Sequence, residues 1–85
     1  MKPVLFTPTA EIQLKEWSAT NKKIHNKIID LLEAIQNSPF KGIGKPEPLK
    51  HQMKGCWSRR ISEADRLVYQ VTPEAILVIS CRFHY

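Results

Sequence analysis

Apolar residues recur at the spacing of an α-helix in the N-terminal half of the chain. Ile24, Ile28, Leu31 and Ile35 lie three or four residues apart, and Ile29 and Leu32 widen the apolar stripe. This pattern predicts an amphipathic helix with one buried face. Thr20 or Asn21 can cap its first turn, and Ser38-Pro39 should end it.

A shorter helix is predicted just before this one. Thr7 followed by Pro8 is typical of an N-cap with proline at the first helical position. Apolar side chains then share one helical face up to an end near Ser18, at Ala10, Leu14 and Trp17. The segment Lys2–Phe6, which is apolar from Pro3 onward, predicts a short strand ahead of this helix.

β-branched and aromatic residues dominate the C-terminal third, where they predict strands at Cys56–Ile61, Arg66–Val71 and Ala75–His84. The short segments between them suit hairpins. The whole pattern predicts an α+β fold, with two N-terminal helices packed on one face of a twisted antiparallel sheet. Residues 1–85 should form a single domain.

Alternation along these strands assigns their side chains to two faces. The predicted helix-facing set is almost wholly apolar: Trp57, Ile61, Leu67, Tyr69, Val71, Leu77, Ile79, Cys81 and Phe83. The opposite set is polar and basic: Ser58, Arg60, Arg66, Gln70, Ser80, Arg82 and His84. Three arginines and a histidine on one solvent-facing side predict a site for an anion.

The segment Pro39–Lys54 differs in composition from the segments on either side of it. Its prolines, glycines and lysines are compatible with neither a helix nor a strand, so it predicts an extended loop. Loops of this length in a small domain are usually functional. The loop carries one carboxylate, Glu47, which would lie over the basic sheet face.

Composition narrows the class of protein. With 42% hydrophobic and 25% charged residues, the chain is typical of a globular domain. Its longest apolar run, Ala75–Ile79, is far too short for a membrane span, and no signal peptide is recognisable, so we expect a cytoplasmic protein. Cys56 and Cys81 should be reduced and buried, and no Cys/His spacing predicts a metal site.

The net charge of +5 suggests a polyanionic partner, of which nucleic acid is the commonest. The excess is uneven, because residues 1–37 carry +1 and residues 38–85 carry +4. Lysines of the loop (Lys41, Lys45, Lys50 and Lys54) are expected to contact a phosphate backbone rather than to act in catalysis.

The basic face and its carboxylate meet the requirements of RNA cleavage without a metal or cofactor. A base must take the proton of the ribose 2′-OH, cations must stabilise the charge on phosphorus, and an acid must protonate the leaving 5′ oxygen. Glu47 and His84 could supply the base and the acid, and Arg60 and Arg66 could hold the phosphate.

Each candidate also has a purely structural interpretation. Glu47 could be a solvated loop carboxylate, and Arg60 could pair with Glu63 or Asp65 across the hairpin. His84 could lie in a frayed terminus, which would leave His51 as the alternative acid. Trp57 is most simply a core residue, although an exposed Trp57 could stack on a base.

Four blocks of the sequence resemble the YoeB family of toxins, within the RelE/ParE superfamily of bacterial toxin–antitoxin modules. They are PFKGIGKPEPLKH at 39–51, GCWSRRI at 55–61, RLVY at 66–69 and CRFHY at 81–85. Two positions depart from the family pattern. Asp65 stands where the family often has a noncatalytic histidine, and Cys56 replaces a more usual aromatic residue.

The resemblance implies a microbial-ribonuclease-like fold and an mRNA interferase that acts in the ribosomal A site. Glu47 would be the general base and His84 the general acid, and Arg66 with Arg60 would stabilise the transition state. Lys50 and Tyr85 would position the RNA, beside the basic Lys45 and Lys54. The implied partners are mRNA on the ribosome, ribosomal RNA, a YefM-like antitoxin that covers the active site, and a second copy of the chain.

Two other functions remain open at this stage. A noncatalytic relative would bind RNA or an antitoxin without cutting. A ParE-like protein would inhibit DNA gyrase, but that activity has no need for a paired acid and base such as Glu47 and His84.

Overall fold

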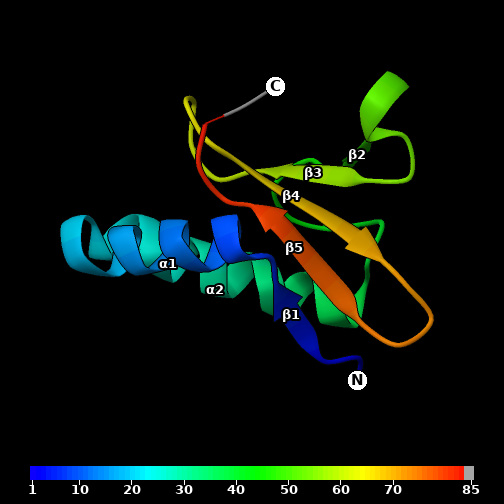
Figure 1. Cartoon of the computed structure of the whole chain (residues 1–85), viewed down its shortest axis with the longest axis horizontal. Coiled ribbons are helices and arrows are strands. Elements are labelled where there is room, and N and C mark those ends of the chain that lie inside the picture. Colours follow the sequence, from blue (N-terminus) through cyan, green and yellow to red (C-terminus); the bar gives the residue numbers. More distant parts are fainter. Residues whose placement is uncertain (84–85) are drawn as a thin grey trace.

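Five strands form one sheet in the computed structural model, which describes residues 1–83 (Figure 1). The strand order is β1-β5-β4-β3-β2. In chain order the elements are β1 (Val4–Phe6), α1 (Pro8–Thr20), α2 (Lys22–Asn37), β2 (Glu47–Pro48), the 3-10 turn η1 (His51–Met53), β3 (Trp57–Arg60), β4 (Arg66–Val71) and β5 (Ile76–Ser80). The predicted α+β class is confirmed.

Both helices begin at the predicted caps. The Thr7 hydroxyl accepts from the Ala10 N–H at 3.1 Å and donates to the Ile79 carbonyl at 2.8 Å, so it joins the start of α1 to β5. The side chain of Asn21 caps α2 by accepting from the Ile24 N–H at 3.2 Å. Ser38 ends α2, as Ser38-Pro39 predicts.

The sheet is mixed rather than wholly antiparallel, which corrects the sequence prediction. β1 pairs with β5 in parallel, with Leu5 opposite Leu77, while the other neighbouring strands are antiparallel. A parallel pair needs a long crossover between its strands, and most of the chain, including both helices, lies between β1 and β5. Local patterns give no direction of pairing for such distant strands.

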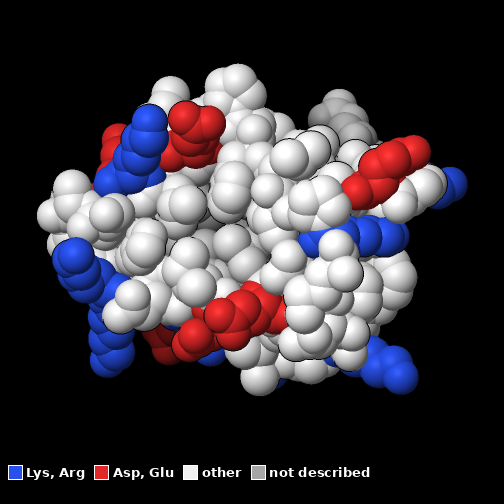
Figure 2. All heavy atoms as spheres, turned by 90° about the horizontal axis from the view of Figure 1, so that it is seen from below, with Lys and Arg blue, Asp and Glu red and all other residues white. Residues whose placement is uncertain are grey.

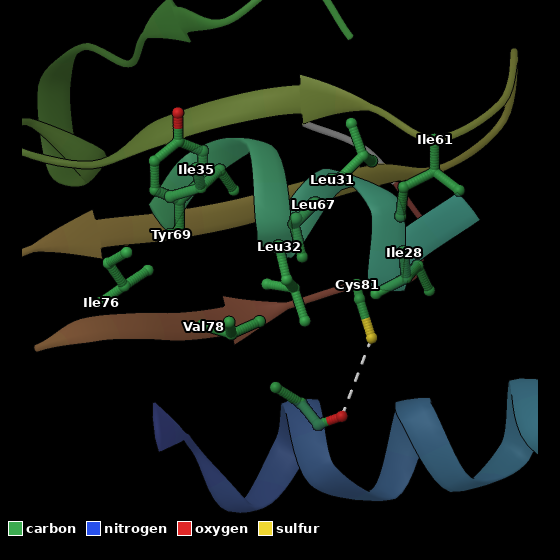
Figure 3. Packing of buried hydrophobic residues seen from close by; sticks show 11 residues of the cluster. Ile28, Leu31, Leu32, Ile35, Ile61, Leu67, Tyr69, Ile76, Val78 and Cys81 are labelled. Atoms are coloured by element: carbon green, nitrogen blue, oxygen red, sulfur yellow. Dashed lines mark hydrogen bonds between the residues drawn. The ribbon is translucent and has the colours of Figure 1, made fainter. Parts of the chain in front are cut away.

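The core lies between α2 and the central strands. Figure 3 shows the side chains of Ile28, Leu31, Leu32 and Ile35 directed toward Leu67, Tyr69, Val78 and Cys81. Ala10, Leu14 and Trp17 of α1 belong to or pack against the same cluster, as their spacing predicts. The Cys81 thiol lies 3.7 Å from the Ala10 carbonyl, which brings α1 against the end of the last strand.

The predicted assignment of β5 side chains to the two faces of the sheet is wrong for residues 76–79. Ile76 and Val78 are buried in the core, whereas Leu77 and Ile79 are only partly buried. The register explains the change, because Tyr69 pairs with Val78 but the preceding Val68 pairs with Ser80. One extra residue in β5 reverses the alternation, and Cys81 therefore lies in the core as predicted. Within residues 1–83, neither helix is long and apolar enough to cross a membrane.

Candidate functional site

Glu47 lies on a short edge strand rather than in an unstructured loop. Residues 47–48 pair with β3, and Glu47 is directly opposite Ser58. A proline is tolerated at Pro48 because an edge strand leaves one side of its backbone unpaired. The cross-strand pairing places the Glu47 carboxylate on the same sheet face as Ser58, the face opposite the helices.

Arg66 joins Glu47 on this face. One guanidinium nitrogen of Arg66, Nη1, lies 3.1 Å from Glu47 Oε1 and 3.4 Å from the Ser58 hydroxyl. The Arg66 side chain is 24% exposed and that of Glu47 is 58% exposed, so the pair is accessible from solvent. An open pocket of about 270 Å³ is lined by Glu47, Leu49, Ser58 and Arg66.

Arg60 lies on the same sheet face as this pocket but does not line it. It is exposed and is paired in register with Arg66 across β3 and β4. Within the described chain it forms no ion pair with Glu63 or Asp65, the alternative that the sequence left open. The structure therefore brings Glu47, Arg60 and Arg66 to one face, as the sequence predicts.

A buried arginine holds the loop that leads to Glu47. The side chain of Arg59 is fully buried on the helix-facing side of β3. Its guanidinium donates to the carbonyls of Ser38, Lys41 and Ile43 at 2.7–3.0 Å, and Nε donates to the Tyr69 hydroxyl at 3.1 Å. Three of these four hydrogen bonds thus fix residues 38–43 against the sheet, ahead of the start of β2.

Arg59 is the residue that sequence reasoning missed. Its signal was present, since strand alternation gives Arg59 the same face as Trp57 and Ile61, which were assigned to the core. A basic residue at the centre of an apolar face needs many hydrogen-bond acceptors. The loop carbonyls supply them, and Tyr69 in turn donates to the Pro39 carbonyl at 2.7 Å.

The lysines predicted to bind RNA lie close to Glu47 in sequence. Lys45 precedes β2, Lys50 follows the pocket residue Leu49, and Lys54 follows η1, and all three are exposed. His51, the alternative acid, is exposed on η1. Trp57 is half-buried and lies against Phe40, with 4.8 Å between the ring centroids.

Arg82 does not join the basic face, which corrects another prediction. Its guanidinium lies 5.1 Å from the centre of the Trp17 ring and forms an ion pair with Glu16 at 3.1 Å. Both partners belong to α1. Arg82 reaches them because β5 ends at Ser80 and the chain then turns toward that helix. Phe83, predicted to pack on the helices, is exposed. The candidate acid His84 and the candidate RNA-binding Tyr85 lie outside the described residues.

Charge on the face of the molecule seen from below is mixed. Figure 2, seen from below the view of Figure 1, shows basic and acidic side chains spread around an uncharged centre. The positive excess therefore does not form one patch on that face. Within residues 1–83, no group of three or more His, Cys, Asp or Glu side chains is arranged to hold a metal ion.

Burial suppresses ionisation of the groups in the core. It raises the pKa of the Cys81 thiol to about 11, with a further contribution from the nearby Asp65 carboxylate. Burial also raises the pKa of the Cys56 thiol, and it raises that of the Tyr69 hydroxyl against the opposing effect of Arg59. At neutral pH both thiols are protonated, so they are poor nucleophiles.

Comparison with known proteins identifies the family to which this chain belongs. Residues 6–85 match the family model for the YoeB-like toxin of bacterial type II toxin–antitoxin systems. The Synechocystis toxin YoeB is 53% identical over 82 residues, which cover 96% of this chain and 95% of that protein. A Staphylococcus aureus YoeB dimer superposes with a TM-score of 0.93 at 40% identity, over 99% of this chain and 98% of that one. A chain of a YoeB–YefM complex from the same organism superposes with a TM-score of 0.92 at 41% identity, over 100% of this chain and 99% of that one. The chain that carries the Glu47–Arg66 pocket is therefore a member of the YoeB family of type II toxins.

Proposed function

We propose that this toxin is an endoribonuclease that cleaves mRNA on the ribosome at the Glu47–Arg66 pocket. The observation that carries the proposal is the contact of one Arg66 nitrogen with both Glu47 and Ser58, beside the opposed cation Arg60. In phosphodiester cleavage by a 2′-OH, a carboxylate can serve as the base and two guanidinium groups can stabilise the charge on the phosphate, while the acid must come from a further residue.

The Glu47–Arg66 ion pair suggests how the site is activated. A scissile phosphate bound to Arg66 would compete with Glu47 for the same guanidinium nitrogen. The carboxylate would then be free to take the proton of the 2′-OH. Arg60 would neutralise a second phosphoryl oxygen.

The reaction balances without an external reactant. The 2′ oxygen forms a bond to phosphorus while the bond from phosphorus to the 5′ oxygen breaks. Glu47 accepts the 2′ proton, and His84, the proposed acid, gives a proton to the leaving 5′ oxygen. The products are a 2′,3′-cyclic phosphate and a 5′-hydroxyl end.

Dependence on the ribosome fits the openness of the site. The pocket has few walls of its own, and more than half of the Glu47 side chain is exposed. Alignment of the 2′-OH with phosphorus must then come from a scaffold that holds the mRNA. Lys45, Lys50, Lys54 and Tyr85 are proposed to contact mRNA or ribosomal RNA around the pocket, and this function places the protein in the cytoplasm.

A YefM-like antitoxin is the proposed inhibitory partner. The S. aureus relative was solved as a complex with YefM, and also as a dimer. An acidic antitoxin segment laid over Arg60 and Arg66 would occupy the phosphate site. We propose the same inhibition and the same self-association for this chain.

Mapping of mRNA 5′ ends in a purified translation reaction tests the cleavage. The wild type should produce 5′-hydroxyl ends within codons, only when ribosomes are present. Glu47→Gln, Arg66→Gln and His84→Ala should each lower the cleavage rate by about 10²- to 10⁴-fold. Glu74→Gln, which removes an exposed carboxylate in the β4–β5 turn, is the matched control and should cleave like the wild type.

Two results would contradict the proposal. Unchanged cleavage by both Glu47→Gln and His84→Ala would exclude the assigned acid and base. No cleavage by the wild type, together with intact antitoxin binding, would instead indicate a noncatalytic relative. A DNA supercoiling assay on the same preparations separates that outcome from gyrase inhibition.

A further inference from the structure

Asp65 is a nearly buried carboxylate that holds the end of the described chain. The residue is 9% exposed and lies directly before β4. Its Oδ1 accepts the backbone N–H of Phe83 at 2.6 Å, and its Oδ2 accepts from the Ser62 hydroxyl at 3.4 Å. Within residues 1–83, no Lys or Arg forms an ion pair with it. The backbone of Phe83 is thus its shortest contact.

Phe83 is held by backbone hydrogen bonds, and its ring contacts only the neighbouring Arg82 guanidinium, at 5.3 Å, among the ring contacts of residues 1–83. The residue is 65% exposed, so burial of the side chain contributes little to its position. Its φ of 64° lies in the left-handed region, which costs a residue other than glycine about 1–2 kcal/mol. Two hydrogen bonds offset this cost, one from the Phe83 N–H to Asp65 and one from the Arg66 N–H to the Phe83 carbonyl at 2.9 Å.

We call the hydrogen bond between Asp65 and the Phe83 N–H the clamp. The hydrogen bond from the Arg66 N–H to the Phe83 carbonyl connects this clamp to the pocket. The Arg66 backbone holds the Phe83 carbonyl, while the Arg66 side chain reaches Glu47 and Ser58. The backbone of Phe83 is therefore fixed relative to the Arg66 guanidinium. The next residue in the sequence is His84.

We propose that Asp65 is a positioning residue for catalysis. Its carboxylate keeps Phe83 in the left-handed conformation and so sets the direction in which the chain continues to His84, the acid of the proposed reaction. This inference rests on the proposed function. A charge-assisted hydrogen bond to a buried carboxylate is stronger than one between neutral groups, which suits a clamp on an otherwise exposed segment.

Amide exchange measured by NMR tests the clamp without reference to activity. In the wild type the Phe83 N–H should exchange slowly. Asp65→Ala should speed this exchange at least about tenfold, while the core amides of Leu67 and Tyr69 stay protected. Asp65→Asn retains an acceptor oxygen and should keep much of the protection. Glu63→Ala, an exposed acidic residue in the same hairpin, should change nothing.

Cleavage kinetics with the same variants test the positioning role. Asp65→Ala should lower kcat by about 10- to 100-fold with little change in KM, because a displaced acid affects the chemical step and not the binding of RNA. Asp65→Asn should restore most of the rate. If Asp65→Ala does not fold, Asp65→Ser, which is too short to keep the bond, is expected to give the same two effects.

The outcomes separate the two proposals. Fast Phe83 exchange with wild-type kcat would overturn the positioning role and leave the cleavage mechanism intact. Slow Phe83 exchange in Asp65→Ala would overturn the clamp itself. A wild type that cuts no RNA overturns the proposed function and with it the catalytic role of Asp65, whatever the exchange data show.

Discussion

Arg60 and Arg66 are directly opposed across β3 and β4, so two cations share one cross-strand site. Like charges directly opposite each other destabilise a sheet, whereas a pair of opposite charges stabilises it by roughly 0.2–1 kcal/mol. Glu47 partly compensates by contacting Arg66, but Arg60 has no ion-pair partner within residues 1–83. An arrangement of this kind favours a bound anion.

Arg60→Gln should therefore separate stability from activity. The free energy of unfolding in urea should stay the same or rise by a few tenths of a kcal/mol, roughly, because the repulsion is removed. Cleavage should fall. Added phosphate should raise the Tm of the wild type more than that of the variant. Lower stability and full activity in Arg60→Gln would contradict this interpretation.

Arg59 is buried, whereas its neighbour Arg60 is exposed. The same substitution at the two positions therefore compares a buried arginine with an exposed one. Arg59→Met should lower the free energy of unfolding by about 3–5 kcal/mol, because it leaves Tyr69 and three loop carbonyls without their donor. Arg60→Met should change it by less than about 0.5 kcal/mol. Urea denaturation of both variants gives the comparison, and equal effects would contradict the assigned role of Arg59.

Gly44 should tolerate no side chain. Its φ is +83°, and a Cβ there would lie 2.8 Å from Leu31 Cδ2 and 3.1 Å from Arg59 Cβ. Gly55 has a similar φ of +95°, but the nearest atom to its Cβ would be 4.0 Å away. In both alanine variants the positive φ lowers the free energy of unfolding. In Gly44→Ala the steric overlap should lower it by about 1–3 kcal/mol more. Chemical denaturation of the two variants measures the difference.

Alkaline pH should destabilise the fold through Cys81. Burial raises the pKa of this thiol from 9.0 to about 11, so between these values the unfolded chain loses a proton that the folded chain keeps. The contribution of the buried, protonated thiol to the free energy of unfolding is therefore complete below about pH 9. It is lost as the pH rises toward 11, by an amount on the order of 2 kcal/mol. Urea denaturation at pH 7.5 and pH 10.5 should show a smaller loss for Cys81→Ala than for the wild type.

The loop lysines should govern the salt dependence of RNA binding. Replacement of Lys45, Lys50 and Lys54 by alanine should reduce the slope of log Kd against log salt by about 2 for a single-stranded RNA. Replacement of Lys22, Lys23 and Lys27 on α2 removes the same charge and is the control. An RNA with methylated 2′ oxygens keeps the ligand intact. Equal slopes in the two triple variants would indicate nonspecific attraction only.

Sequence patterns predicted the helices and strands well because their determinants are local. Thr7 and Asn21 cap the helices through their own side chains, and β4 spans Arg66–Val71 as its composition predicts. The residues of Pro39–Lys54 were harder to assign. A two-residue strand at Glu47–Pro48 depends on a distant partner, Ser58 and Trp57, and no local pattern specifies it.

The sequence by itself determined the α+β class, the helix caps, and the placement of Arg60 and Arg66 on one face through strand alternation. Only the tertiary structure decided the parallel pairing of β1, the shifted register of β5, the departure of Arg82 to α1 and the burial of Arg59. It also brought Asp65 to Phe83. The physical reason is range: caps and alternation act between near neighbours, whereas these contacts join segments that only the folded chain brings together.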